Sequence, residues 1–201
     1  MTKYSNKYDS PLEILYTQYS IKLAQYLNKC KLKPNDITTL GVIFNFFALL
    51  SLFNKDFMLF FTFLILGHFC DALDGIYARL YNMESEIGYY YDHIADGLKI
   101  LSLAYAFYIL YYPKIDDVNM VIIYLIFLLC TIHFSIKSRL YSLEGEKVDL
   151  TLQPWIKIGA IFGKKEKLQK MAQYTKYFDE SMSLIYITLV MSIIHYRIYF
   201  K

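Results

Sequence analysis

The chain has 201 residues, of which 56% are hydrophobic, 18% aromatic and 19% charged, and this composition indicates one compact helical domain. Its formal net charge of +3 is too small to indicate a nucleic-acid partner. The three cysteines lack the spacing of a metal or redox motif, so we interpret them as apolar residues of a reducing compartment.

The first 36 residues carry lysines but no short apolar stretch followed by small residues, so they do not resemble a cleavable signal peptide. Ser10, Pro11 and Glu13 have the spacing of a capping residue, a first-turn proline and a capping-box glutamate. Apolar residues then recur at helical spacing as far as Leu27. This pattern favours an amphipathic helix on the cytoplasmic membrane surface over a helix packed on protein.

Five uncharged runs follow, and several approach the roughly 20 residues that cross a bilayer. They occupy residues 37–54, 57–70, 100–113, 118–136 and 181–196. A soluble protein with long buried helices is the alternative, but five such runs exceed what one soluble core of this size would bury. The sequence therefore predicts an all-α, polytopic integral membrane bundle of five to six transmembrane helices behind the N-terminal interfacial helix.

The expected helices are longer than the uncharged runs. We expect spans at residues 37–54, from 57 to about 81, at 87–112, from about 118 to 143, and at roughly 181–200. The basic loop at 144–180 contains an apolar piece, 155–162, that is too short to span. One domain, 1–201, would thus comprise a cytoplasmic N-terminus at 1–36 and a transmembrane bundle at 37–201.

Positive charge gathers before the first span and between the last two, whereas the opposite loops contain only Lys55 and Lys114. By the positive-inside bias, the N-terminus and the basic loop are cytoplasmic. Counting spans then places the end of the second helix, with its acidic residues, on the cytoplasmic side of a multi-pass membrane protein.

Four aspartates lie at helical spacing on either side of the polar turn at 82–86. Asp71 and Asp74 are three residues apart on the second spanning helix, and Asp92 and Asp96 are four apart on the third. Two facing helices can therefore present four carboxylates to one cavity.

Four bare carboxylates near membrane depth would repel one another, so bound cations must balance them. Hard oxygen ligands favour Mg²⁺ or Mn²⁺ over zinc. Two divalent ions would neutralise four aspartates and leave a positive field for a diphosphate, as in two-metal phosphoryl transfer. A divalent cation carrier that uses the aspartates as its pathway is the non-enzymatic alternative.

Small residues and one arginine accompany the aspartates. Gly75, Ala78 and Gly88 would let helices approach closely and leave room for a nucleotide, although ordinary helix packing explains each one alone. Arg79 could bind phosphate oxygens as a fork, or its side chain could extend to the membrane interface.

The spacing Asp71-x2-Asp74-Gly75-x2-Ala78-Arg79-x8-Gly88-x3-Asp92-x3-Asp96 matches the signature of the CDP-alcohol phosphatidyltransferase family at every fixed position. The segment Pro34-Asn35-Asp36-Ile37-Thr38 also resembles the entry to the first spanning helix in many members. Intramembrane prenyltransferases also bind diphosphate through aspartates, but their motifs lack the Gly-x2-Ala-Arg spacing.

This resemblance implies an integral membrane enzyme of phospholipid synthesis, usually with six spans and often dimeric, that releases CMP from a CDP-linked donor. It implies that Asp71, Asp74 and Asp92 ligate two metal ions. Asp96 would lie near the metals and act as general base on the acceptor hydroxyl. The CDP site would be lined by Gly75, Ala78, Arg79 and Gly88.

The identity of the acceptor rests on weaker features. At the cytoplasmic end of the fourth expected span, Lys137, Ser138 and Arg139 resemble a basic cluster that holds an acceptor phosphate in some members, although positive-inside anchoring explains them equally well. With the short chain, they favour transfer of a phosphatidyl group from CDP-diacylglycerol to a glycerol phosphate or inositol type of acceptor. Asp92-His93 instead resembles CDP-choline and CDP-ethanolamine phosphotransferases that act on diacylglycerol. A sixth span would require part of 150–174 to cross the membrane.

Overall fold

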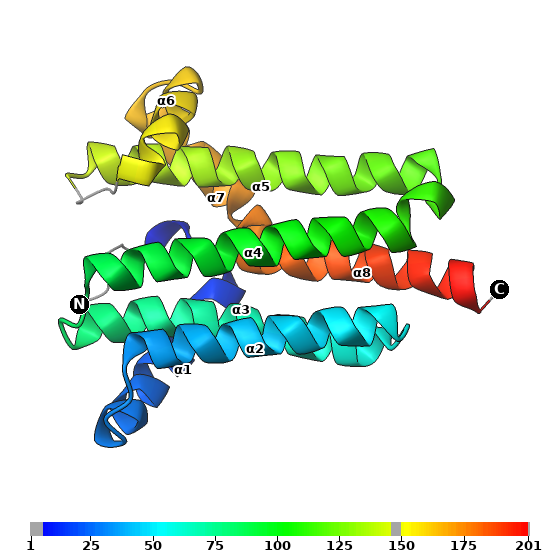
Figure 1. Ribbon diagram of the computed structural model, residues 1–201. Coiled ribbons are helices and arrows are strands. Elements are labelled where there is room, and N and C mark those ends of the chain that lie inside the picture. The colour runs from blue at the N-terminus through cyan, green and yellow to red at the C-terminus, as the bar shows by residue number, and fades with distance from the viewer. Residues whose placement is uncertain (1–5, 146–149, 201) are drawn as a thin grey trace. The chain divides into compact units, whose positions relative to one another are not determined.

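The computed structural model describes residues 6–145 and 150–200, and the only regular secondary structure in these ranges is helical. Five α-helices of this described part are long and apolar enough to cross a membrane, in agreement with the predicted all-α polytopic bundle. They are α2 (Pro34–Phe53), α3 (Phe57–Leu80), α4 (Glu86–Leu110), α5 (Asp117–Leu143) and α8 (Glu180–Tyr199) (Figure 1).

The described chain also contains three shorter α-helices. They are α1 (Pro11–Lys29), α6 (Gln153–Ile161) and α7 (Lys165–Thr175). At 9 and 11 residues, α6 and α7 are far too short to cross a bilayer. The alternative that residues 150–174 supply a sixth span is therefore wrong for the described chain, because Gly163 and the lysines around it divide this stretch into two helices.

The chain forms two compact units. The first consists of Leu15–Asp116 and the C-terminal segment from Ser192, and the second consists of the N-terminal segment up to Ile14 and Asp117–Met191. The family-like aspartates all belong to the first unit, whereas Lys137 and Arg139 belong to the second.

A tight turn joins α2 to α3 in the first unit. Lys55 adopts a left-handed backbone with φ of 63°, and Asp56 caps α3 by accepting a 3.0 Å hydrogen bond from the Leu59 amide. At the other end of α2, the Asp36 carboxylate accepts a 2.8 Å hydrogen bond from the Lys33 amide. The helix consequently starts at Pro34, three residues before the predicted Ile37.

A second turn carries the chain from α3 to α4. Asn82 takes the left-handed conformation at φ of 53°, and the Met83 amide donates a 2.8 Å hydrogen bond to the Ala78 carbonyl, which closes α3. Ser85 then caps α4 by accepting a 3.0 Å bond from the Gly88 amide. This turn reverses the chain, so that Asp71 and Asp74 on α3 come near Asp92 and Asp96 on α4.

The core of the first unit lies where α1, α2 and α3 meet. It contains Ala24, Ile37, Cys70, Leu73 and Tyr77. The Tyr77 hydroxyl donates a 2.8 Å hydrogen bond to the Leu32 carbonyl and so attaches α3 to the segment between α1 and α2. While Ala24 of α1 is buried, Leu15, Tyr19, Leu23 and Tyr26 of that helix are exposed, and a membrane-surface position for this face remains a prediction.

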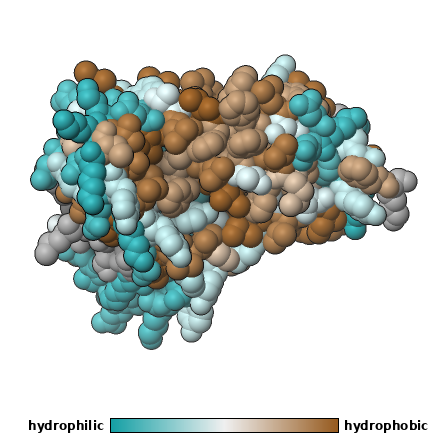
Figure 2. All heavy atoms as spheres, turned by 90° about the horizontal axis from the view of Figure 1, so that it is seen from below, coloured by the Kyte–Doolittle hydropathy of each residue, from teal (hydrophilic) through white to brown (hydrophobic). Residues whose placement is uncertain are grey.

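Many large apolar side chains of the spanning helices face outward, which suits contact with lipid rather than water. On α2 and α4 these include Leu40, Ile43, Phe46, Leu50, Ile94, Leu98, Leu101, Tyr105 and Tyr108. On the face drawn in Figure 2, hydrophobic side chains form a broad band, and hydrophilic ones gather on either side of it.

The second unit packs α6 and α7 against α5. Its core is formed by Tyr8, Ile136, Leu140, Tyr141, Leu168 and Ala172. At Gly159, α6 approaches α5 so closely that a Cβ atom would collide with the Ser135 carbonyl oxygen. Only glycine fits this crossing.

The predicted cap of α1 forms, but with different partners. Ser10 accepts a 3.1 Å hydrogen bond from the Glu13 amide as expected. The Glu13 carboxylate does not return to the Ser10 amide, because it accepts a hydrogen bond from the Ser181 hydroxyl. Asp179 replaces it, with Oδ2 2.9 Å from the Ser10 nitrogen. The predicted capping box is thus wrong in its second half.

Candidate active site

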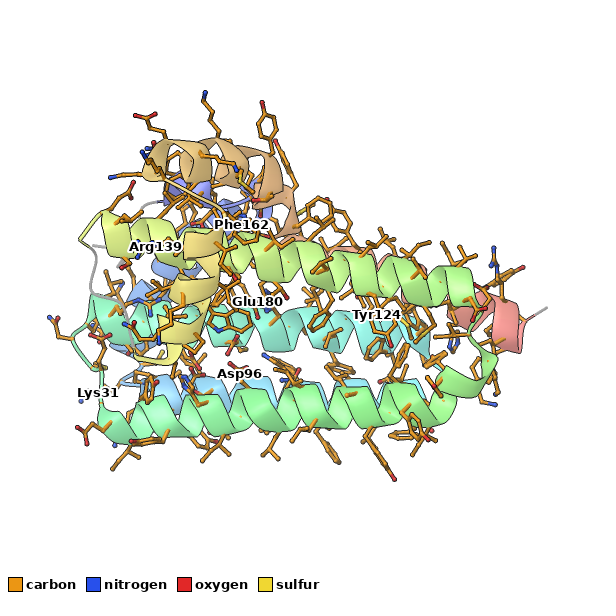
Figure 3. The ribbon with its side chains drawn as sticks, turned by 90° about the horizontal axis from the view of Figure 1, so that it is seen from above. Lys31, Asp96, Tyr124, Arg139, Phe162 and Glu180 are labelled. Atoms are coloured by element: carbon orange, nitrogen blue, oxygen red, sulfur yellow. The ribbon has the colours of Figure 1, made fainter. Side chains whose placement is uncertain are left out.

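Three carboxylates of the first unit converge between α3 and α4. Asp71 comes from α3, Asp92 and Asp96 come from α4, and one oxygen of each lies within 4.8 Å of the others. All three residues are half-buried. Figure 3 shows Asp96 directed from α4 toward α3. The helical spacing read from the sequence therefore does bring these three side chains together.

Asp74 lies beside this group but has a different environment. It is 5% exposed, and the Thr38 hydroxyl on α2 donates a hydrogen bond of 2.5 Å to its Oδ2. Together with Asp71 and Asp96 it lines one small cavity, although it is not among the three closest carboxylates. One of the four predicted ligands is thus held by the neighbouring helix.

The first turns of α2 position both acidic helices. Besides the bond from Thr38 to Asp74, the Thr39 hydroxyl lies 2.9 Å from the Tyr91 hydroxyl on α4. Thr38 was not among the site residues predicted from the sequence. The resemblance of residues 34–38 to the family's helix entry was the signal that could have identified it.

The cavity beside the aspartates is narrow. Its volume of about 10 Å³ has room for roughly one water molecule, and it extends along α2 and α3 past Gly41 and Gly67 to Asn45. A Cβ atom at Gly67 would lie 2.5 Å from Oδ1 of Asn45, and one at Gly41 would lie 3.2 Å from Cβ of Cys70. These two glycines, which were not predicted as part of the site, let α2 and α3 approach closely.

The predicted CDP-binding residues surround the end of α3 and the start of α4. The Arg79 guanidinium folds back over Gly75, since a Cβ atom there would lie 3.2 Å from Nη1 of Arg79. A Cβ atom at Gly88 would lie 3.0 Å from Oγ of Ser85 and 3.1 Å from Oδ1 of Asn35, so a side chain there would crowd both the cap of α4 and the start of α2. The Ala78 carbonyl accepts the hydrogen bond from the Met83 amide that ends α3.

The carboxylate cluster fits a divalent cation. Its donors are hard oxygens, and Oδ1 of Asp92 is buried without a hydrogen-bond partner in the described chain. A buried, unpartnered carboxylate oxygen beside two further carboxylates needs positive charge nearby. The protein itself supplies part of that charge, because the Lys99 ammonium lies 2.6 Å from Oδ1 of Asp96 and 3.6 Å from Oδ2 of Asp71.

Lys99 was not predicted from the sequence. The signal was its position three residues after Asp96, which places it on the same face of α4.

The two basic candidates of the second unit differ in their surroundings. Lys137 forms an ion pair with the Asp9 carboxylate, and Asp9 is only 8% exposed. Arg139 is half-buried on α5 beside α6 and forms no ion pair with any described residue (Figure 3). Of the two, only Arg139 has a cationic group that is not neutralised by a carboxylate of the described chain.

One comparison with known proteins gave a match. The model of the CDP-alcohol phosphatidyltransferase family matches residues 31–194, a range that includes all four aspartates and extends through both units. No curated protein and no solved structure matched the chain.

Proposed function

Because this chain belongs to the CDP-alcohol phosphatidyltransferase family, we propose that it transfers a phosphatidyl group from CDP-diacylglycerol to a polar alcohol, with release of CMP. The family implies a CDP-alcohol substrate and a lipid environment, and the five apolar helices suit a multi-pass membrane protein. The observation that carries the proposal is the convergence of Asp71, Asp92 and Asp96 within 4.8 Å of one another.

The family is generally dependent on divalent metal ions, and the acidic cluster could hold them. We propose Asp71, Asp74, Asp92 and Asp96 as the ligands of two Mg²⁺ or Mn²⁺ ions. When bound, such ions neutralise the charge that develops on the diphosphate oxygens. Thr38 supports this set, because its hydroxyl fixes the orientation of the Asp74 carboxylate.

The reaction exchanges one phosphorus–oxygen bond for another. The acceptor hydroxyl oxygen bonds to the phosphorus next to the diacylglycerol group, and the bond from that phosphorus to the bridging oxygen of CMP breaks. Asp96 is the proposed general base that takes the hydroxyl proton. Its side chain is 41% accessible, against 27% for that of Asp71, which suits contact with an entering alcohol.

The donor nucleotide is assigned to Gly75, Ala78, Arg79 and Gly88. The planar fork of the Arg79 guanidinium suits phosphate oxygens. Because Gly75 has no side chain, the Arg79 guanidinium can lie directly over it. We infer that this side chain swings from Gly75 to the diphosphate when the donor binds.

For the acceptor, we propose a phosphorylated alcohol of the glycerol phosphate or inositol phosphate type. Arg139 is the stronger candidate for its phosphate, because Lys137 is already paired with Asp9. We also propose that the two units form one domain, since the family match runs through both, and that the site opens to the cytoplasm, in agreement with the distribution of lysine and arginine. A homodimer is a further proposal from the family resemblance.

The decisive experiment is an exchange assay on the purified, detergent-solubilised protein. Incubated with CDP-diacylglycerol, Mn²⁺ and labelled CMP, the enzyme should transfer label into the donor lipid, whereas a cation carrier would not. A screen of glycerol 3-phosphate, inositol phosphate and uncharged alcohols, following the lipid product, then identifies the acceptor. Transfer only from CDP-choline or CDP-ethanolamine to diacylglycerol would overturn the proposed donor within the same family.

A further inference from the structure

A lysine is built into the carboxylate cluster at a position that the family-like motif does not include. Lys99 follows Asp96 by one helical turn on α4, and its ammonium lies 2.6 Å from Oδ1 of Asp96 and 3.6 Å from Oδ2 of Asp71. Its side chain is 15% exposed. It thus joins a ligand candidate of α4 to one of α3.

The position of Lys99 makes this pairing necessary. It lies near the middle of α4, a 25-residue helix with mainly apolar side chains, far from either end of the candidate span. A charged side chain at such depth is costly unless it is paired. The cavity that Lys99 lines holds only about 10 Å³, too little to surround the ammonium with water in place of the carboxylates.

The same carboxylate oxygens are those assigned to the divalent cations. An ammonium within 4 Å of two carboxylates lowers the negative potential that attracts a further cation. Lys99 therefore competes with any divalent ion for Asp71 and Asp96. Its flexible four-carbon stem allows the ammonium to move, without a movement of α4, toward the accessible side of Asp96, whose side chain is 41% exposed.

We propose that Lys99 is an internal counter-ion of the acidic cluster: its ammonium neutralises Asp71 and Asp96 and yields these oxygens when a divalent cation binds. Lys99 thereby sets the affinity of the site for the cation. This inference rests on the proposed function, because it takes the acidic cluster to be the metal site of the enzyme.

The test is a titration of Mn²⁺ into the purified, chelator-treated protein without donor or acceptor, in which free Mn²⁺ is followed by electron paramagnetic resonance. Lys99→Met should bind Mn²⁺ at least about tenfold more tightly than the unsubstituted protein, because one positive charge is removed within 4 Å of the ligands. Lys99→Arg, which keeps the charge, should not show this gain. Lys114→Met is the matched control, since it removes one charge beyond the C-terminal end of α4, which is Leu110, and should leave the affinity unchanged.

A second measurement covers the outcome that Lys99→Met does not fold. Lys99→Gln keeps a hydrogen-bond donor but loses the charge, and Mn²⁺ should raise its melting temperature more than that of the unsubstituted protein. Equal or weaker Mn²⁺ binding by the uncharged variants would overturn the role of Lys99 while leaving the enzyme assignment intact. Failure of the unsubstituted protein to bind Mn²⁺ at all would overturn both.

Discussion

The Thr38 hydroxyl on α2 donates a hydrogen bond of 2.5 Å to Oδ2 of Asp74 on α3, the most buried of the four motif aspartates. This bond joins two segments with separate resemblances to the family, the helix entry at 34–38 and the acidic motif at 71–96. One oxygen of Asp74 is thereby fixed while its carboxylate still lines the cavity of the cluster. Through Thr38, the helix entry therefore lines the candidate site as well as beginning a candidate transmembrane span.

Replacing Thr38 by valine should impair both stability and activity. The substitution keeps the side-chain shape but leaves the buried Asp74 oxygen without its donor, at an expected cost of about 1–3 kcal/mol in the free energy of unfolding. A group that orients a metal ligand typically contributes 10- to 100-fold in activity or metal affinity. The measurements are the melting temperature in detergent and the rate of CMP release.

Thr38→Ser is the control, because it retains the hydroxyl and should keep most of the activity. If the valine variant worked as well as the serine variant, the hydrogen bond to Asp74 would have no part in the reaction.

Asp96→Asn should abolish transfer but leave donor binding largely intact. The amide cannot accept the acceptor's proton, and loss of a general base typically lowers the rate by about 10²- to 10⁴-fold. Asp71, Asp74 and Asp92 remain, so labelled CDP-diacylglycerol should still bind with little change in Kd. Transfer at the unsubstituted rate would contradict the assignment of Asp96 as base.

Asp71→Ala should weaken cation and nucleotide binding together. Asp71 is the only contribution of α3 to the close group of three carboxylates, so its loss removes one side of the proposed cation site. The Mn²⁺ concentration for half-maximal activity and the Kd for CDP-diacylglycerol should both rise. Removing Mn²⁺ with a chelator should give the same loss in the unsubstituted enzyme. A normal Mn²⁺ response in the variant would show that Asp71 is not a ligand.

The spanning helices and the convergence of three aspartates could be predicted from the sequence because both follow from local patterns. Long apolar runs determine the first, and helical spacing on either side of a short polar turn determines the second. Asp71, Asp92 and Asp96 consequently lie where their spacing placed them.

What could not be predicted depends on contacts between distant parts of the chain. Asp179, far along the sequence, displaces Glu13 from the cap of α1, and Asp9 pairs with Lys137 across 128 positions. The two residues of each pair lie on different segments, so helical spacing in the sequence cannot predict their contact. Lys99 is different: its spacing from Asp96 was visible, but its second partner, Asp71, lies on another helix.

Gly67→Ala should destabilise the protein through one specific contact. The added Cβ would lie 2.5 Å from Oδ1 of Asn45, and such overpacking typically costs about 1–3 kcal/mol. The double variant Asn45→Ala with Gly67→Ala should recover most of that loss, because it removes the atom that is struck. Melting temperatures of the single and double variants measure this coupling.

Gly97→Ala is the matched control and should not lower the melting temperature. No atom lies within 4 Å of its added Cβ, and alanine favours a helix over glycine by about 1 kcal/mol. Strictly additive effects of the two substitutions at 45 and 67 would mean that α2 and α3 do not meet at these residues.

Substitutions of Lys137 and Arg139 should have different effects, because we expect Lys137 to stabilise the fold and Arg139 to bind the acceptor. Lys137→Gln leaves the buried Asp9 carboxylate unpaired, and breaking a buried ion pair costs about 3–5 kcal/mol, so the melting temperature should fall sharply. Arg139→Gln breaks no ion pair of the described chain and should leave the melting temperature nearly unchanged. It should instead raise KM for a phosphorylated acceptor about tenfold, a loss of about 1.4 kcal/mol in binding, without changing KM for the CDP-linked donor. Lys137→Gln could instead raise the acceptor KM and keep the melting temperature. Lys137 would then exchange its ion pair with Asp9 for a contact with the acceptor, and it would be the acceptor-binding residue in place of Arg139.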